Sequence, residues 1–122
     1  MKKKKSKNIL VIDDEKDLLE LFTRVLKSYP VETAQNEKEA FEKLAAQNFA
    51  VIFLDVVMPG VDFMEHFKTI RKMQPKAKIL LMTGFAVEDQ INRALELGAV
   101  GVMYKPMEHI NDIEEAVKRV LK

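Results

Sequence analysis

Residues 51–60 read VIFLDVVMPG, and a single aspartate, Asp55, ends the apolar run at residues 51–54. Four consecutive apolar residues predict a strand buried on both faces, as in a parallel sheet. A carboxylate in such surroundings is unusual because charged side chains are rarely buried without a partner. The stretch therefore predicts a layered α/β fold and marks Asp55 as a candidate functional residue.

The rest of the chain repeats this pattern of apolar runs separated by segments with helical spacing. The predicted strands are residues 9–12, 31–34, 50–54, 78–82 and 100–104. The first helical segment carries Leu18, Leu19, Phe22, Val25 and Leu26. The last helical segment carries Ile110, Ile113, Val117, Val120 and Leu121. Asn36, with Glu39 three residues later, is typical of a helix start, and Gly98 is typical of a helix end.

Alternating strands and helices predict right-handed crossovers and a parallel sheet covered by helices on both faces. The expected fold class is α/β: a flavodoxin-like (βα)5 three-layer sandwich with a five-stranded sheet of order 2-1-3-4-5. We expect one domain over residues 8–122, preceded by a basic, flexible tail at residues 1–7.

Polar residues follow four of the apolar runs: Asp13 and Asp14 the first, Asp55 the third, Thr83 the fourth and Lys105 the fifth. Because parallel strands all point the same way, these residues gather at one edge of the sheet. In open α/β sheets this edge binds the ligand where the strand order reverses, here between the first and third strands. Any one of the five alone is more often a turn former, helix cap or surface charge. All five together predict a site.

The charges at this edge predict a cation. Three clustered carboxylates repel one another, which raises the pKa of each unless a cation neutralises them. Oxygen ligands without histidine or cysteine suit Mg²⁺, or Mn²⁺, rather than zinc. The chain has no cysteine at all, which excludes disulfides and thiolate metal sites.

The composition is that of an ordinary globular protein, with 48% hydrophobic and 32% charged residues in 122 and a net charge of +1. This charge provides no general attraction for nucleic acid or acidic substrates. No stretch approaches the roughly 20 apolar residues that cross a bilayer. The lysines at residues 2–5 are better explained as a solvated terminus than as a nucleic-acid or membrane patch. The lack of cysteine fits a reducing compartment, and we expect a cytoplasmic protein.

The motifs VIDDE, LDVVMPG, MTG and YKP, in this order and spacing, resemble the receiver domain of two-component response regulators. The resemblance covers residues 8–121. It implies a signalling module rather than an enzyme, with Asp55 as phosphoacceptor, that promotes its own phosphorylation and dephosphorylation. The implied partners are a sensor histidine kinase or histidine phosphotransfer protein and a downstream output protein or domain. The implied state is a monomer or a phosphorylation-linked dimer, with no contact of this domain to nucleic acid or membrane.

The resemblance also implies how the metal is held. Asp14, Asp55 and the backbone carbonyl of Val57 would bind Mg²⁺ directly, and Asp13 would act through a coordinated water. Lys105 would pair with the phosphoryl group.

Thr83 is the implied switch residue, since its hydroxyl would bond the phosphoryl group after transfer. The loop after Thr83 and the face formed by the fourth helix, fifth strand and fifth helix would shift with it. The Lys105–Pro106 peptide bond is expected to be cis, and an X–Pro bond is the linkage at which cis costs little.

Two positions depart from the family pattern. Phe63 follows Asp62 where the family usually has glycine, which indicates a loop without positive φ and, in preference to a partner contact, a side chain packed in the core. Val102 occupies a position that is commonly aromatic. We hypothesise that Tyr104 or Phe85 replaces this aromatic, or that output runs through the loop after the fourth strand alone.

Val57 and Phe85, two residues after Asp55 and Thr83, should flank the route of water to an acyl phosphate. Apolar side chains there cannot position a hydrolytic water, so a longer-lived phosphoryl state is expected.

Two rival functions belong to other classes. A small Mg²⁺-dependent phosphohydrolase would typically need a second carboxylate near its nucleophile, where Val57 stands. A phosphorylation-independent interaction domain on this fold usually lacks an acidic residue or the lysine. In this chain all five polar residues at the strand ends, the three aspartates, Thr83 and Lys105, are present. Nucleotide binding is disfavoured because there are only four glycines and neither a G-x-G-x-x-G nor a P-loop motif. His66 and His109 match no ligand spacing and are expected to be surface histidines.

Overall fold

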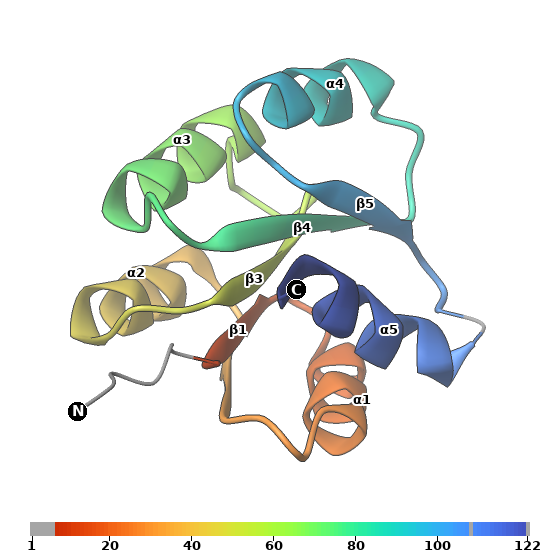
Figure 1. The fold of residues 1–122 in the computed structure, drawn as a ribbon. Coiled ribbons are helices and arrows are strands. Elements are labelled where there is room, and N and C mark those ends of the chain that lie inside the picture. Colours follow the sequence, from red (N-terminus) through yellow and green to blue (C-terminus); the bar gives the residue numbers. More distant parts are fainter. Residues whose placement is uncertain (1–6, 108, 122) are drawn as a thin grey trace.

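The computed structural model describes residues 7–107 and 109–121. Its five strands are β1 (Ile9–Ile12), β2 (Val31–Ala34), β3 (Val51–Asp55), β4 (Lys78–Thr83) and β5 (Gly101–Tyr104). All neighbouring strands are parallel, and the sheet order is β2-β1-β3-β4-β5 (Figure 1). The predicted flavodoxin-like α/β fold class is confirmed. The predicted tail at residues 1–7 lies, apart from Lys7, outside the described residues, as does residue 122 of the predicted domain.

The helices are α1 (Lys16–Val25), α2 (Glu37–Ala46), α3 (Phe63–Met73), α4 (Glu88–Glu96) and α5 (Ile110–Leu121). Figure 1 shows α1 and α5 on one face of the sheet and α2, α3 and α4 on the other. Within the described part of the chain, no helix has the length and apolar character needed to span a membrane.

Each central strand contributes to two cores because successive side chains point to opposite faces. In β1, Leu10 and Ile12 pack with the α2–α4 layer, whereas Ile9 and Val11 pack with α1 and α5. All four are fully buried. This two-sided burial explains why β1 and the first four residues of β3 are uninterrupted apolar runs.

The structure confirms the predicted helix start at Asn36 and the predicted helix end at Gly98. The Asn36 side chain accepts a 2.9 Å bond from the Glu39 backbone N–H, and the Glu39 carboxylate accepts one of 2.9 Å from the Gln35 N–H. Gly98 ends α4 with a φ of 109°, a conformation that favours glycine. Phe63 is buried at the start of α3, and no described residue other than glycine has positive φ. The packing role expected for Phe63 is confirmed.

The buried position of His66 shows that one prediction was wrong. We expected a surface histidine, but its side chain is 1% exposed and packs edge-on against Phe41 of α2, with ring centroids 5.3 Å apart. Neither ring nitrogen has a hydrogen-bond partner among the described residues. The spacing of Phe63, His66, Phe67 and Ile70 places all four on the buried face of α3, which overrides the usual exposure of histidine. His109 is exposed, as expected.

The amide of Gln74 joins three segments at the N-terminal ends of the strands. Its Nε2 donates to the carbonyls of Leu44, at 3.0 Å, and Gln47, at 2.9 Å. Its Oε1 accepts a 3.0 Å bond from the Phe49 backbone N–H. This buried amide therefore satisfies carbonyls at the end of α2 and a donor just before β3, which would otherwise be left without partners.

Candidate functional site

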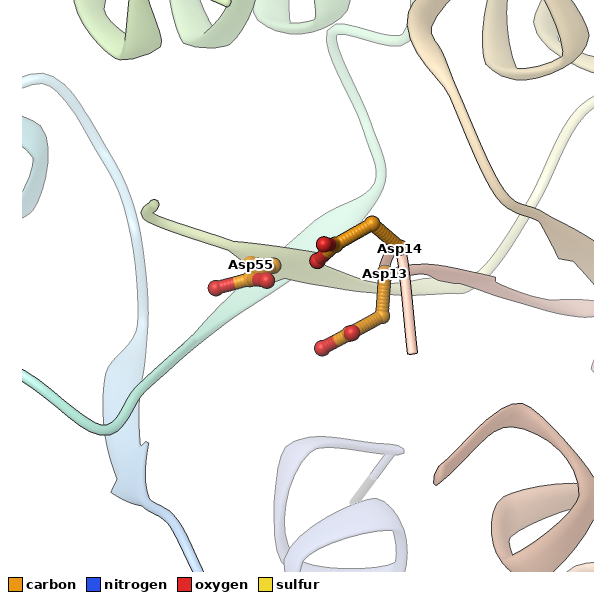
Figure 2. Close-up of side chains that lie close together, drawn as sticks. All are labelled: Asp13, Asp14 and Asp55. Carbon is orange, nitrogen blue, oxygen red and sulfur yellow. The ribbon is translucent and has the colours of Figure 1, made fainter. Parts of the chain in front are cut away.

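The strand register brings the two buried aspartates together. β1 and β3 pair up to Ile12 and Leu54, so Asp13 and Asp55 are the next residues on adjacent strands. One carboxylate oxygen from each of Asp13, Asp14 and Asp55 lies within 4.8 Å of the others. Figure 2 shows the three carboxylates gathered at the ends of these strands. The predicted acidic cluster is present.

Lys105 reaches this cluster from the loop after β5. Its Nζ lies 2.7 Å from Asp13 Oδ2, 3.2 Å from Asp55 Oδ2 and 2.9 Å from Glu15 Oε1. Its backbone N–H donates to the carbonyl of Thr83 at 2.9 Å, which ties the loop to the end of β4. The Lys105–Pro106 bond is cis, as the resemblance implied. The contact of Lys105 with Glu15 was not predicted.

Backbone donors orient the other oxygen of each buried carboxylate. The Val57 N–H donates to Asp55 Oδ1 at 3.1 Å, and the Glu15 N–H donates to Asp13 Oδ1 at 2.8 Å. Each carboxylate is thus held between a loop amide on one side and the Lys105 ammonium on the other. Such double attachment fixes the direction in which the oxygens point.

The pKa values show that the site carries unbalanced negative charge. Burial, together with repulsion from Asp13, raises the pKa of Asp55 to about 7, and Lys105 only partly opposes this shift. Burial likewise raises the pKa of Asp13. Burial alone would lower the pKa of Lys105, but its bonds to Asp13 and Glu15 and the neighbouring charges outweigh burial and raise that pKa. One ammonium therefore does not neutralise the cluster.

The donor set fits a hard divalent cation. The oxygens of Asp13, Asp14 and Asp55 are the ligand type that Mg²⁺, Mn²⁺ and Ca²⁺ prefer. Among the described residues, the buried Asp13 Oδ2 has no regular hydrogen bond, only the ion contact with Lys105. A cation would therefore meet an acceptor whose capacity is not used up.

Thr83 is fully buried at the end of β4, and its hydroxyl is engaged locally. Oγ1 accepts a 3.0 Å bond from the Phe85 N–H and lies 3.2 Å from the Phe85 carbonyl, to which it donates. The Phe85 ring is 63% exposed, and Tyr104, which faces Thr83 across the β4–β5 pair, is 60% exposed. Val102 is partly buried against the α2–α4 layer. Both aromatic rings have room to change position.

A groove of about 850 Å³ opens over the cluster. Beside Asp14, Asp55 and Lys105, its lining includes apolar side chains from α1 and the loops after β3, β4 and β5: Leu18, Leu21, Val57, Met58, Phe85 and Met107. The acidic cluster is therefore reached from outside through a partly apolar entrance.

Residues 9–118 match the response regulator receiver domain. The chain belongs to this family. It is a receiver domain of two-component response regulators, and hence a signalling module, which agrees with the function that the motifs predicted.

Curated relatives include both short and long proteins. Sporulation initiation phosphotransferase F of Bacillus subtilis is 28% identical and is matched over 95% of this chain and 94% of its own length. The alkaline phosphatase synthesis transcriptional regulatory protein PhoP of the same species is 34% identical over 96% of this chain. This chain spans 49% of that regulator, about half its length.

Solved receivers share the fold. A response regulator of Burkholderia pseudomallei, with a phosphorylated aspartic acid, calcium ion and citrate, is 29% identical, with a TM-score of 0.81 over 95% of this chain and 71% of its own. TrrA of Thermotoga maritima, in complex with Mg²⁺ and beryllofluoride, is 33% identical, with a TM-score of 0.77 over 93% of this chain and 98% of its own. Receiver structures similar to this chain thus contain divalent cations.

Proposed function

We propose that this receiver is switched by transfer of a phosphoryl group from a partner phosphohistidine to Asp55, with Mg²⁺ bound directly by Asp14, Asp55 and the Val57 carbonyl and, through a coordinated water, by Asp13. The observation that carries the proposal is the position of Asp55, a buried carboxylate that lies beside two other aspartates and 3.2 Å from the Lys105 ammonium. The Burkholderia pseudomallei regulator contains a phosphorylated aspartic acid, which supports the same chemistry for this chain.

The proposed reaction is an in-line displacement at phosphorus. An Asp55 oxygen forms the new P–O bond while the bond from phosphorus to the donor nitrogen breaks, and the electron pair stays on the imidazole. The Val57 N–H and Lys105 hold the two oxygens of Asp55 for this approach. When bound, Mg²⁺ would supply charge neutralisation among the carboxylates and at the phosphoryl oxygens. Lys105 would stabilise the charge that remains.

The proposed switch begins with the local bonds of Thr83. We propose that its hydroxyl leaves the Phe85 backbone and bonds to the phosphoryl group, so that the β4–α4 loop moves with it. The change would reach a downstream protein or domain through the α4–β5–α5 face, with Phe85 or Tyr104 as the moving aromatic or with the loop acting alone. The domain would act either as a monomer or as a phosphorylation-linked dimer.

The groove supports a proposed route by which the phosphoryl donor would approach Asp55. A sensor histidine kinase or histidine phosphotransfer protein would insert its phosphohistidine between α1 and the loop after β5, where Leu18, Leu21 and Met107 are partly exposed. Val57 and Phe85 border the same groove and offer no group that could orient a hydrolytic water, so the phosphoryl state should be long-lived. We place this exchange in the cytoplasm.

The test is the intact mass after incubation with acetyl phosphate and Mg²⁺. The wild type should gain one phosphate, whereas Asp55→Asn and a sample with chelator should gain none. Asp112→Asn removes an exposed carboxylate on α5 and should behave as the wild type. Phosphate gain by Asp55→Asn equal to that of the wild type would refute the proposal. Continuous release of phosphate over many turnovers would favour the rival phosphohydrolase.

A further inference from the structure

Glu15 stands at an unusual position for its side chain. It is the N-cap residue of α1, but its carboxylate makes no capping bond to the helix. N-cap positions favour Ser, Thr, Asp and Asn because their short side chains reach the free N–H groups of the first turn. In this chain the longer Glu15 side chain crosses to the loop after β5, where Oε1 accepts a 2.9 Å bond from Lys105 Nζ, 90 residues further along the sequence.

The contact completes the coordination of the Lys105 ammonium. An ammonium has three N–H donors, and Lys105 Nζ has three carboxylate neighbours, of which Asp13 and Glu15 are nearer than Asp55. The Glu15 backbone is held in place, because its N–H is bonded to Asp13 Oδ1, and its side chain, 59% exposed, extends from there to Lys105. The loops after β1 and β5 are thus linked across the mouth of the groove.

A lysine side chain loses much rotamer freedom when its end is fixed. Phosphorylation would change only the third partner of Lys105, since a phosphoryl oxygen would take the place of the Asp55 oxygen. The ion contact with Asp13 and the bond to Glu15 can persist through this change. Holding Lys105 in advance reduces the ordering that must accompany phosphoryl transfer.

We propose that Glu15 is a positioning residue, whose carboxylate holds the Lys105 ammonium beside Asp55 before the phosphoryl group arrives. The inference rests on the proposed function, in which Lys105 pairs with the phosphoryl group. It assigns Glu15 to the site although Glu15 touches neither the phosphoryl group nor the reacting carboxylate.

Two variants of Glu15 distinguish the effect of its contact with Lys105 from the effect of its negative charge. Glu15→Gln keeps an oxygen that can accept from Lys105 but removes the charge. Glu15→Ser removes the reach to Lys105 and supplies a favoured N-cap, so the thermal stability of this variant should be maintained or raised. Glu20→Gln, an exposed position on α1 outside the groove lining, is the control for loss of one negative charge.

The first measurement is the NMR signal of the Lys105 ammonium in the free protein, assigned by its loss in Lys105→Arg. Proton exchange with water should become several-fold faster in Glu15→Ser and change less in Glu15→Gln. The second measurement is the affinity for beryllofluoride with Mg²⁺. It should fall roughly two- to five-fold in Glu15→Ser, the size expected for a partly exposed ion pair. Glu20→Gln should match the wild type in both.

Unchanged ammonium exchange in Glu15→Ser would overturn the inference. Beryllofluoride binding in both Glu15 variants that is equal to or tighter than in the wild type would also overturn it, since Glu15 would then make no favourable contribution to binding of the phosphoryl mimic. Failure of the wild type itself to bind beryllofluoride would refute the proposed function, and the positioning role with it, even where the ammonium signal shows the contact. The two measurements therefore distinguish the failures.

Discussion

Asp55 is in an unfavourable position for a charged group. Its side chain is 3% exposed, and its nearest charged neighbours include a second buried carboxylate. The raised pKa expresses the free energy needed to ionise this group in the folded protein. In the proposed reaction, the ionised form is nevertheless the one that attacks phosphorus. The residue therefore decreases the stability of the fold at neutral pH in order to serve the proposed chemistry.

Asp55→Asn should therefore change how stability depends on pH. Because the folded-state pKa, about 7, exceeds the ordinary value of 3.8, the folded wild type binds more protons between these values. The contribution of Asp55 to stability is complete below about pH 4 and is lost as the pH rises through about 7. Without Mg²⁺, the free energy of unfolding of Asp55→Asn should exceed that of the wild type by roughly 1–3 kcal/mol at pH 8.

Urea unfolding between pH 4 and 8 measures this effect. The difference between the two proteins should shrink as the pH falls toward 4. Glu42→Gln, which removes an exposed carboxylate on α2, provides the comparison and should show a nearly constant difference. A stability difference for Asp55→Asn that is equal at both ends of the range would contradict the expected ionisation.

At the residue scale, the sequence predicted which side chains meet but not all of their partners. Asp13, Asp14, Asp55 and Lys105 could be placed together because strand ends share an edge. Glu15 could not, because it was taken only as part of a motif, and its reach across the groove depends on the loop after β5.

At the scale of elements, the bounds predicted for the five strands agree with the structure to within one residue. β3 and β5 each begin one residue later than expected, and β3 and β4 each end one later, so Asp55 and Thr83 belong to their strands. The Gln74 bonds could not be foreseen, because they join residues far apart in sequence. The buried His66 could have been foreseen, because its spacing from Phe63 and Ile70 was a usable signal.

The contact between α2 and α3 should be sensitive to acid through His66. Burial lowers the pKa of His66 below its ordinary value, and Glu37 opposes this only in part. The unfolded chain then binds more protons, so stability is lost as the pH falls below about 6.5. His66→Leu should stabilise the protein by about 1 kcal/mol at pH 7, by removing unpaired buried nitrogens, and by more at pH 5.5.

The His66 prediction is measured as the midpoint of thermal unfolding at the two pH values. His109→Leu, the same substitution at the exposed histidine, should leave the pH dependence unchanged. A loss of stability at pH 5.5 that is as steep in His66→Leu as in the wild type would show that other groups control acid unfolding.

At the scale of the whole molecule, the arrangement of the sheet followed from the alternation of strands and helices. Two-sided burial requires uninterrupted apolar strands, and the right-handed crossover limits the arrangements to very few. The roles of individual residues do not follow in the same way. Whether Phe85 or Tyr104 moves depends on two states of the protein, and neither a sequence nor one conformation contains that comparison.

If the proposed function holds, Mg²⁺ should stabilise the entire domain, because it would bind the folded site and not the unfolded chain. At tenfold excess over its Kd, the gain is about 1.4 kcal/mol, which corresponds to a rise in Tm of roughly 4–8 °C. The rise should be larger at pH 8 than at pH 6, since Asp55 must lose its proton. Scanning calorimetry with and without Mg²⁺ measures it, with Asp14→Asn as the variant that should respond weakly. An undiminished response in Asp14→Asn would place the ion elsewhere.

The bonds of Gln74 have a consequence for the distribution of motion in the domain. They lie at the N-terminal ends of the strands, opposite the acidic cluster, and Arg71 extends them by donating to the carbonyls of Gln74, at 2.6 Å, and Ala77, at 2.7 Å. That end of the molecule is held by several side-chain bonds to the backbone of other segments, whereas at the other end the Lys105 side chain contacts Asp13, Glu15 and Asp55. A rearrangement around a phosphorylated Asp55 can consequently be confined to the loops beside the acidic cluster, while the opposite end of the sheet and its helices keep their positions.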